Sequence, residues 1–204
     1  MYTEIMDLIR KCDRSRVAFA VGTAFGVLAL AAGASAPAAF AADEGAIQQL
    51  IETNKCPGCD LHEADFRRLD LSGADLTGAD LEGANFYYAN LDGAQLTDAN
   101  LIDVNLGYTS IRGAALDGSD MRYAIFDHTN LSGTSMTDTD LRESYIDGAI
   151  FTSSVLDGAN MRDTLFVNAD FSDARSLCGA ISWAGIEMRR GCLVEVPEQI
   201  DDNF

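Results

Sequence analysis

Large apolar residues recur at every fifth position through the middle of the chain. The series runs without a break through Leu61, Phe66, Leu71, Leu76, Leu81, Phe86, Leu91, Leu96, Leu101, Leu106, Ile111, Leu116, Met121, Phe126, Leu131, Met136, Leu141, Ile146, Phe151, Leu156, Met161, Phe166 and Phe171. Two residues before each stands a small residue, usually Ala, Ser or Thr, with Leu69 and Val104 as bulky departures. A period of five fits neither a helix nor a strand, so the pattern predicts a solenoid of short repeats.

A step of five residues that always points one large and one small side chain inward requires a corner at every step. Four such steps close a square coil of 20 residues, so residues 20 apart should lie above one another. The large residues then sort into four columns, one of which is rich in phenylalanine. Because parallel strands lie ~4.8 Å apart, the nearly six coils would stack to a length of roughly 25–30 Å.

The corners are marked by the residue two places after each large one. Glycine stands there at Gly73, Gly78, Gly83, Gly93, Gly113, Gly118, Gly133, Gly148 and Gly158. This spacing suits a turn whose third residue has positive φ, a region that Gly enters without steric cost. Short Asx side chains also tolerate that region, and they stand at Asp98, Asp103, Asp138, Asp163 and Asn168. Tyrosine does not, so we expect a different turn type at Tyr88, Tyr108 and Tyr123.

Units such as Ala74-Asp75-Leu76-Thr77-Gly78 carry a resemblance to a known family. Over residues 61–171 the chain resembles the pentapeptide-repeat proteins. The resemblance implies an all-β fold, a right-handed quadrilateral parallel β-helix, to which the residue pattern at the two ends adds short helical caps. It implies little about function, because one fold can host many functions. We therefore expect an N-terminal helical cap at 42–59, the solenoid at 60–173, and a C-terminal cap and tail at 174–204.

The first 41 residues do not belong to the repeat. Four basic residues precede an uncharged apolar run from Val17 to Ala32, and Ala39-Phe40-Ala41 forms an A-x-A cleavage pattern before Ala42. These features predict a secretory signal peptide at 1–41 and an exported, periplasmic protein. A thylakoid-lumen location and an uncleaved N-terminal membrane anchor are the alternatives.

Short segments at both ends of the solenoid have the pattern of caps. Ile47, Leu50 and Ile51 lie at helical spacing within residues 46–53, behind acidic residues that suit a helix N-terminus. Apolar residues at 181–188 predict a second cap, also helical. Such caps would cover the open apolar interior and the strand edges of the terminal coils.

Four cysteines remain outside the predicted signal: Cys56, Cys59, Cys178 and Cys192. A disulfide needs Cα atoms within about 7 Å, whereas the stack would separate the two pairs by roughly 25 Å. The sequence therefore predicts the local bonds Cys56–Cys59 and Cys178–Cys192, formed in an oxidising compartment.

The segment Cys56-Pro57-Gly58-Cys59 has a second interpretation as a redox centre. That chemistry favours a first cysteine at a helix N-terminus, but here the motif follows a helix and leads into Asp60-Leu61, so a structural cap is favoured. A start of the form Cys-x-Gly-Cys-Asp-Leu also resembles exported pentapeptide-repeat proteins of bacteria and of thylakoid lumens.

The chain is strongly acidic, with a net charge of −18. Removing residues 1–41, which carry three acidic and four basic side chains, leaves 29 Asp and Glu against 10 Lys and Arg, a net charge of −19. This charge excludes nonspecific nucleic-acid binding. Duplex DNA of the same length would carry on the order of 16 charges. Certain cytoplasmic pentapeptide-repeat proteins are DNA mimics that bind type II topoisomerases, and this resemblance supplies the alternative function.

No pattern in the chain is typical of an enzyme. His62 and His128 are the only histidines and fall in different columns, and no nucleophile set, phosphate loop or metal motif is present. The Asp and Asn residues before the large positions recur with the repeat and are interpreted as solvated or backbone-bonding groups. We expect no enzymatic activity, no cofactor and no metal.

Two surface features stand out from the repeat. Arg122, Arg142 and Arg162 are spaced by 20 and should form a ladder beside Asp120, Asp140 and Asn160. Tyr88 and Tyr108 are also 20 apart, with Tyr87 adjacent and His128 next in the column, which predicts an exposed aromatic patch. Aromatic residues are enriched in interface hot spots. The sequence as a whole indicates an exported, noncatalytic scaffold that binds an unidentified protein, although both features also fit ordinary surface packing.

Overall fold

The structure is a computed structural model that describes residues 42–171 and 173–182. These residues all lie in one of the two compact units of the chain, Ala38–Phe204. They form the helix α2 (Glu44–Thr53) and the strands β1 (Ile125–Asp127), β2 (Tyr145–Asp147) and β3 (Leu165–Val167). The expected signal peptide at 1–41, Cys192 and most of the expected C-terminal cap lie outside the described residues.

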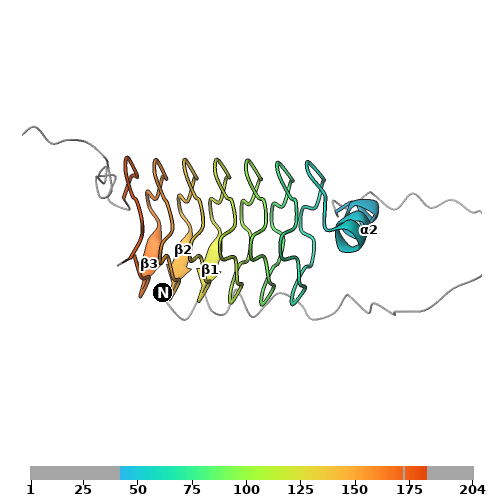
Figure 1. Ribbon diagram of the computed structural model, residues 1–204, viewed down its shortest axis with the longest axis horizontal. Helices are drawn as coiled ribbons and strands as arrows, with labels where there is room; N and C mark the ends of the chain where they lie inside the picture. Colours follow the sequence, from blue (N-terminus) through green and yellow to red (C-terminus); the bar gives the residue numbers. More distant parts are fainter. Residues whose placement is uncertain (1–41, 172, 183–204) are drawn as a thin grey trace, which may run out of the picture. The chain divides into compact units, whose positions relative to one another are not determined.

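The backbone winds into coils of 20 residues that pair in parallel. Isolated bridges join Lys55 to Asp75 and then follow the same offset of 20 along the chain. Strands β1, β2 and β3 continue this pairing, with Phe126 opposite Ile146 and Ile146 opposite Phe166. Figure 1 shows these coils side by side, with the three strands in register. The predicted right-handed quadrilateral parallel β-helix is confirmed.

The large residues of the repeat fill the interior. Every one of them from Leu61 to Met161 is buried, with at most 3% of its surface exposed. The expected stacking between coils is present, since the rings of Phe66 and Phe86 are stacked with centroids 5.0 Å apart. Burial of apolar surface at every step therefore stabilises each coil against the next.

All the corners share one backbone conformation, and here one expectation from the sequence is wrong. Positive φ occurs at the predicted glycines and Asx residues, but also at Tyr88 (62°), Tyr108 (55°) and Tyr123 (61°). The corner amides explain this result, because they donate to the next coil, as Tyr88 N does to Gly107 O at 3.0 Å. Tertiary pairing therefore imposes the left-handed conformation on residues that do not favour it.

The Asp and Asn residues before the large positions accept backbone hydrogen bonds. The Oδ1 of Asp70 accepts from Ser72 N at 3.1 Å, and the Oδ1 of Asn90 accepts from Asp92 N at 3.1 Å. This local bond satisfies an amide that the coil leaves unpaired at the start of each turn. The interpretation as backbone-bonding groups is confirmed for these residues.

Serine at the same position is coupled to an aspartate in the preceding coil. Ser110 Oγ donates to Asp92 Oδ1 at 2.6 Å, and that carboxylate also accepts from the Arg112 amide at 2.8 Å. The same arrangement joins Ser135 and the Thr137 amide to Asp117, and Ser176 and the Cys178 amide to Asp157. Some of the aspartates of this acidic chain thus accept hydrogen bonds from its own backbone amides.

The electrostatics of Asp117 agree with this structural role. Partial burial acts to raise the pKa of its carboxyl, but the hydrogen bonds from Ser135 and Thr137 outweigh burial and lower the pKa. The carboxylate form is therefore favoured by its donors. An aspartate in this state is a fixed acceptor rather than a general acid.

Helix α2 covers the first coil, as predicted, but Ile51, expected on its apolar face, is 55% exposed. Asp43 is its N-cap and accepts from Gly45 N at 2.9 Å, while Asn54 ends the helix in the left-handed conformation. Ala46 and Leu50 are buried against the interior of the solenoid. The helix thus supplies the apolar surface that a preceding coil would otherwise provide.

Parallel pairing continues beyond residue 173. Ser176 pairs with Val155 and Ile181 pairs with Asn160, so the offset grows from 20 to 21. Since Asp170 still pairs with Ile150, one extra residue is accommodated between Asp170 and Ser176. Ser176 and Ile181, which fall in the region expected to form the C-terminal cap (174–204), therefore belong to a further rung of the solenoid. Residues 183–188 lie outside the described residues.

Candidate functional site

The aromatic patch predicted from the sequence forms a continuous stack along one corner of the solenoid. The Tyr88 and Tyr108 rings are stacked with centroids 5.0 Å apart. The Tyr108 and His128 rings follow at 5.1 Å and are almost parallel, at 2°. Tyr87 contacts both tyrosines edge-on, at 4.6 Å from Tyr88 and 5.6 Å from Tyr108. We call these four residues the aromatic corner.

Both ends of the stack are closed. The guanidinium carbon of Arg68 lies 5.6 Å from the Tyr88 ring centroid, within the range of a cation–π contact. At the other end the His128 ring lies over Gly148, where an added Cβ would be 3.2 Å from Nε2. The ring faces are thus occupied within the protein, so the solvent meets ring edges and hydroxyl groups.

Gly107, which was not among the predicted site residues, leaves room for the Tyr87 ring. Gly107 has no positive φ, but a Cβ added there would meet Tyr87 Cδ2 at 2.9 Å and Cε2 at 3.1 Å. The Tyr87 ring therefore occupies the space of the missing side chain. A signal was available in the sequence, because Gly107 is the sole glycine directly after a large residue of the repeat.

The aromatic corner remains accessible. Tyr88 is 49% exposed and Tyr108 is 38% exposed. The Asp127 carboxylate accepts from His128 Nδ1 and raises the pKa of that imidazole. The same Asp127 charge is the main cause of a raised pKa at Tyr108. A folded-state pKa above the ordinary value keeps both groups in their protonated, donating forms over a wider pH range.

The left-handed backbone at Tyr88 and Tyr108 carries an energetic cost that ring stacking roughly offsets. A non-glycine residue in the left-handed conformation costs about 1–2 kcal/mol. A stacked aromatic pair contributes about 0.5–1.5 kcal/mol. The two effects nearly cancel, whereas glycine at the same corners would avoid the cost. The same conformation occurs at Glu63, Tyr123 and Glu143, so this cost alone does not distinguish the aromatic corner from other corners.

The arginine ladder lies one side earlier in the coil and is largely neutralised. Arg122 donates hydrogen bonds from Nε and Nη2 to both carboxylate oxygens of Asp120, and Arg142 binds Asp140 in the same way. These carboxylates raise the pKa of both guanidiniums. Beside Arg162 stands Asn160, whose Oδ1 accepts from the Arg162 amide at 3.4 Å. The structure does not bring this ladder to the aromatic corner, and its pairs fit the expected surface network.

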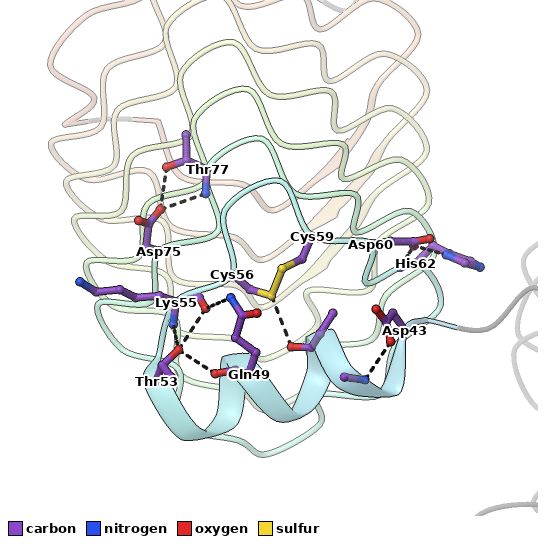
Figure 2. The surroundings of a disulfide bond; sticks show 12 residues. Asp43, Gln49, Thr53, Lys55, Cys56, Cys59, Asp60, His62, Asp75 and Thr77 are labelled. Carbon is purple, nitrogen blue, oxygen red and sulfur yellow. Dashed lines mark hydrogen bonds and ion pairs between the residues drawn. A yellow bond between two sulfur atoms is a disulfide. The ribbon is translucent and has the colours of Figure 1, made fainter.

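Cys56 and Cys59 form the predicted disulfide, with Cα atoms 5.3 Å apart. Cys56 is fully buried, and its Sγ lies 3.3 Å from the Ala46 carbonyl oxygen in α2. Figure 2 shows this disulfide within the first coil, on the side that faces α2. Cys178 is also disulfide-bonded, and its predicted partner Cys192 lies outside the described residues.

The part of the chain that the structure describes holds neither a metal-binding group nor a membrane-spanning helix. No group of three or more His, Cys, Asp or Glu side chains is arranged to hold a metal ion there. No helix in those residues has the length and apolar character needed to cross a bilayer.

Comparison with known proteins bears on the fold. The sequence profile described as Pentapeptide repeats matches in 8 copies, at residues 55–83, 64–101, 99–138 and 134–173. The chain belongs to the pentapeptide-repeat family. No curated protein matches it significantly.

Several solved pentapeptide-repeat structures are similar to this chain. A protein from the thylakoid lumen of Arabidopsis thaliana is 31% identical over 52% of this chain and 71% of its own, with a TM-score of 0.47. Rfr23 from the cyanobacterium Cyanothece 51142 is 23% identical over 68% of this chain and 97% of its own, also with a TM-score of 0.47. QnrB1, a plasmid-mediated fluoroquinolone resistance protein, is 19% identical over 60% of this chain and 66% of its own, with a TM-score of 0.40.

Proposed function

We propose that this pentapeptide-repeat protein is an exported, noncatalytic scaffold that binds a partner protein through its aromatic corner. One observation carries the proposal: Tyr88, Tyr108 and His128 form an exposed stack that Tyr87 contacts edge-on. The stack holds its rings in place before binding. A partner therefore gains contact area without the entropic cost of ordering these side chains.

Because the ring faces of the aromatic corner are already occupied, a protein surface is a more suitable partner than a planar ligand. A nucleobase or a small planar ligand binds by stacking on an open ring face, and here those faces contact Arg68, Gly148 and one another. Ring edges and tyrosine hydroxyls instead suit the apolar side chains and carbonyl groups of a protein surface. The absence of catalysis is part of the proposal, and it is supported by the aspartates that accept backbone amides.

Loss of the aromatic corner should abolish partner binding while leaving the fold intact. Asparagine tolerates positive φ, so Tyr88→Asn with Tyr108→Asn should change stability by under about 1 kcal/mol. Immobilised protein is exposed to an extracytoplasmic extract of the native host, and bound proteins are quantified by mass spectrometry. We expect a partner retained by the wild type to fall at least about tenfold on the double variant, since each tenfold corresponds to about 1.4 kcal/mol.

The chain offers a matched control at Tyr123. This tyrosine has the same positive φ, 61°, and is 46% exposed, but it lies at another corner, where its hydroxyl donates to Glu143 Oε1 at 3.0 Å. Tyr123→Asn should therefore retain the partner. Equal retention by all variants, or no specifically retained protein, would contradict the proposed binding site.

Export is tested by fractionating the native host. We expect a processed form that begins at Ala42 outside the cytoplasm, identified by N-terminal sequencing. A full-length cytosolic product would contradict export and would favour the alternative, an acidic DNA mimic that binds a type II topoisomerase. The described residues carry 24 Asp and Glu against 8 Lys and Arg, so the acidic surface alone does not separate these functions.

A further inference from the structure

The side of the solenoid that carries β1, β2 and β3 changes character along its length. In the first three coils the outward residue before the large one is Asp65, Asn85 or Asn105. In the next three coils the same column holds Ile125, Tyr145 and Leu165, which are register partners in the sheet. Leu165 is 55% exposed and the other two are half-buried. An apolar column thus replaces the amide-binding residues found elsewhere.

An acidic pair lies directly beside this column. Asp127 and Asp147 are paired in register between β1 and β2, so their carboxylates lie in neighbouring coils on one face. Like charges in directly opposed positions destabilise a sheet. His128 contacts Asp127, whereas Asp147 accepts from the Tyr145 hydroxyl at 3.2 Å and from Asn168 Nδ2 at 3.4 Å. No ion pair to Asp147 is present among the residues that the structure describes.

The aromatic corner borders the acidic pair on its other side. Asp127 is adjacent to His128 in the chain, and His128 stacks on Tyr108. From one edge to the other, this surface consists of the apolar column Ile125, Tyr145 and Leu165, then the carboxylates of Asp127 and Asp147, then the aromatic corner. We call this surface the β1–β3 strip.

We propose that the β1–β3 strip binds a basic side chain, arginine or lysine, within an extended apolar segment of the partner protein. The cationic group would lie between Asp127 and Asp147 and relieve their repulsion through charge-assisted hydrogen bonds. Its aliphatic stem would pack on Ile125 and Tyr145, as the stems of long basic side chains do on apolar surfaces. This inference rests on the proposed function and names the chemistry of the partner at that site.

The flanking residues favour an organic cation over a hydrated metal ion. A metal ion would need several oxygen ligands, while the neighbours of the two carboxylates are apolar or aromatic side chains. An arginine or lysine side chain of a peptide can contact both kinds of neighbour. Its charged group would bind the carboxylates, and its aliphatic part would pack on the apolar column. Charge complementarity also agrees with the acidic excess of the described residues.

The inference is tested with a displayed library of random short peptides, selected against the purified disulfide-bonded protein. We expect the enriched peptides to contain Arg or Lys next to apolar residues. Their affinity, measured by fluorescence anisotropy with synthetic copies, should fall at least about tenfold on Asp127→Asn with Asp147→Asn. Asp98→Asn with Asp138→Asn is the matched control, because it removes the same charge from another corner. Binding to this control should be unchanged at moderate salt.

A second measurement tests whether Asp127 and Asp147 repel each other. Asp147→Asn keeps an acceptor for Tyr145 and removes the repulsion with Asp127, so its unfolding midpoint should rise by roughly 1–3 °C at low salt. Asp138→Asn should not show this rise. A lowered midpoint for Asp147→Asn would mean that the carboxylate is structural and would overturn the inference.

The outcomes separate this inference from the proposed function. Enriched peptides without basic residues that still require Tyr88 and Tyr108 would overturn the basic partner and leave the aromatic site standing. Equal losses on the two aspartate pairs would show nonspecific charge attraction and would also overturn the inference. Binding that neither the tyrosine nor the aspartate variants change would contradict both, and so would a failure to enrich any peptide.

Discussion

Leu96→Arg should unfold several coils and cost more than about 4 kcal/mol, the range reached when a charge is buried without a partner. Leu96 is fully buried in the solenoid interior. Each coil contacts only its neighbours, so damage at one step spreads to the coils that stack on it. Thermal unfolding followed by circular dichroism, together with limited proteolysis, measures the effect.

The adjacent substitution Thr97→Arg is the control, because Thr97 lies on the outer surface and is only half-buried. It should change stability by under about 1 kcal/mol. Similar losses for the two variants would show that the inside and outside positions of the repeat are wrongly assigned. The comparison therefore tests the five-residue geometry itself.

Reduction of the Cys56–Cys59 bond should release the N-terminal cap and destabilise it by about 2 kcal/mol, the loop-closure value for so short a ring. The bond joins two positions that face the solenoid interior, and Cys56 Sγ contacts the Ala46 carbonyl of α2. Hydrogen exchange of the amides in α2, Glu44–Thr53, should therefore accelerate on adding reductant.

A double variant, Cys56→Ala with Cys59→Ala, provides the reference for this effect. It should exchange as fast as the reduced protein and should not respond to reductant. If α2 stays protected in the reduced protein, the cap is held by Ala46 and Leu50 alone, and the bond is not a structural staple. A loss of partner binding without loss of protection would instead favour the redox interpretation of Cys56.

Most of the fold followed from the chain because the five-residue period is an unusually constrained signal. The large residues, the predicted glycine corners and the N-terminal helix all appear where the pattern indicated. The aromatic corner was also predictable, since residues 20 apart must stack once the coil length is known. The backbone at Tyr88 and Tyr108 was not predictable, because tyrosine disfavours positive φ and only the hydrogen bonds to the next coil override that preference.

Other features could not be predicted from the sequence, because they depend on contacts between coils. The role of Gly107 depends on where the Tyr87 ring lies, and that ring belongs to the preceding coil. The extra residue before Ser176 interrupts the period, so only the pairing with Val155 reveals that the solenoid continues. In the same way, Asp127 and Asp147 become neighbours only because β1 and β2 pair in this register.

The four-sided coil and its apolar interior are thus encoded locally, because one buried side chain per five residues leaves the chain no other way to hide its apolar surface from water. The surface chemistry arises at longer range. Whether an aspartate accepts an amide of the next coil or lies beside another carboxylate depends on the residue 20 positions away. A tyrosine adopts positive φ because the hydrogen bonds to the adjacent coil require it. Stacking between coils therefore decides where this protein presents its aromatic corner and its β1–β3 strip.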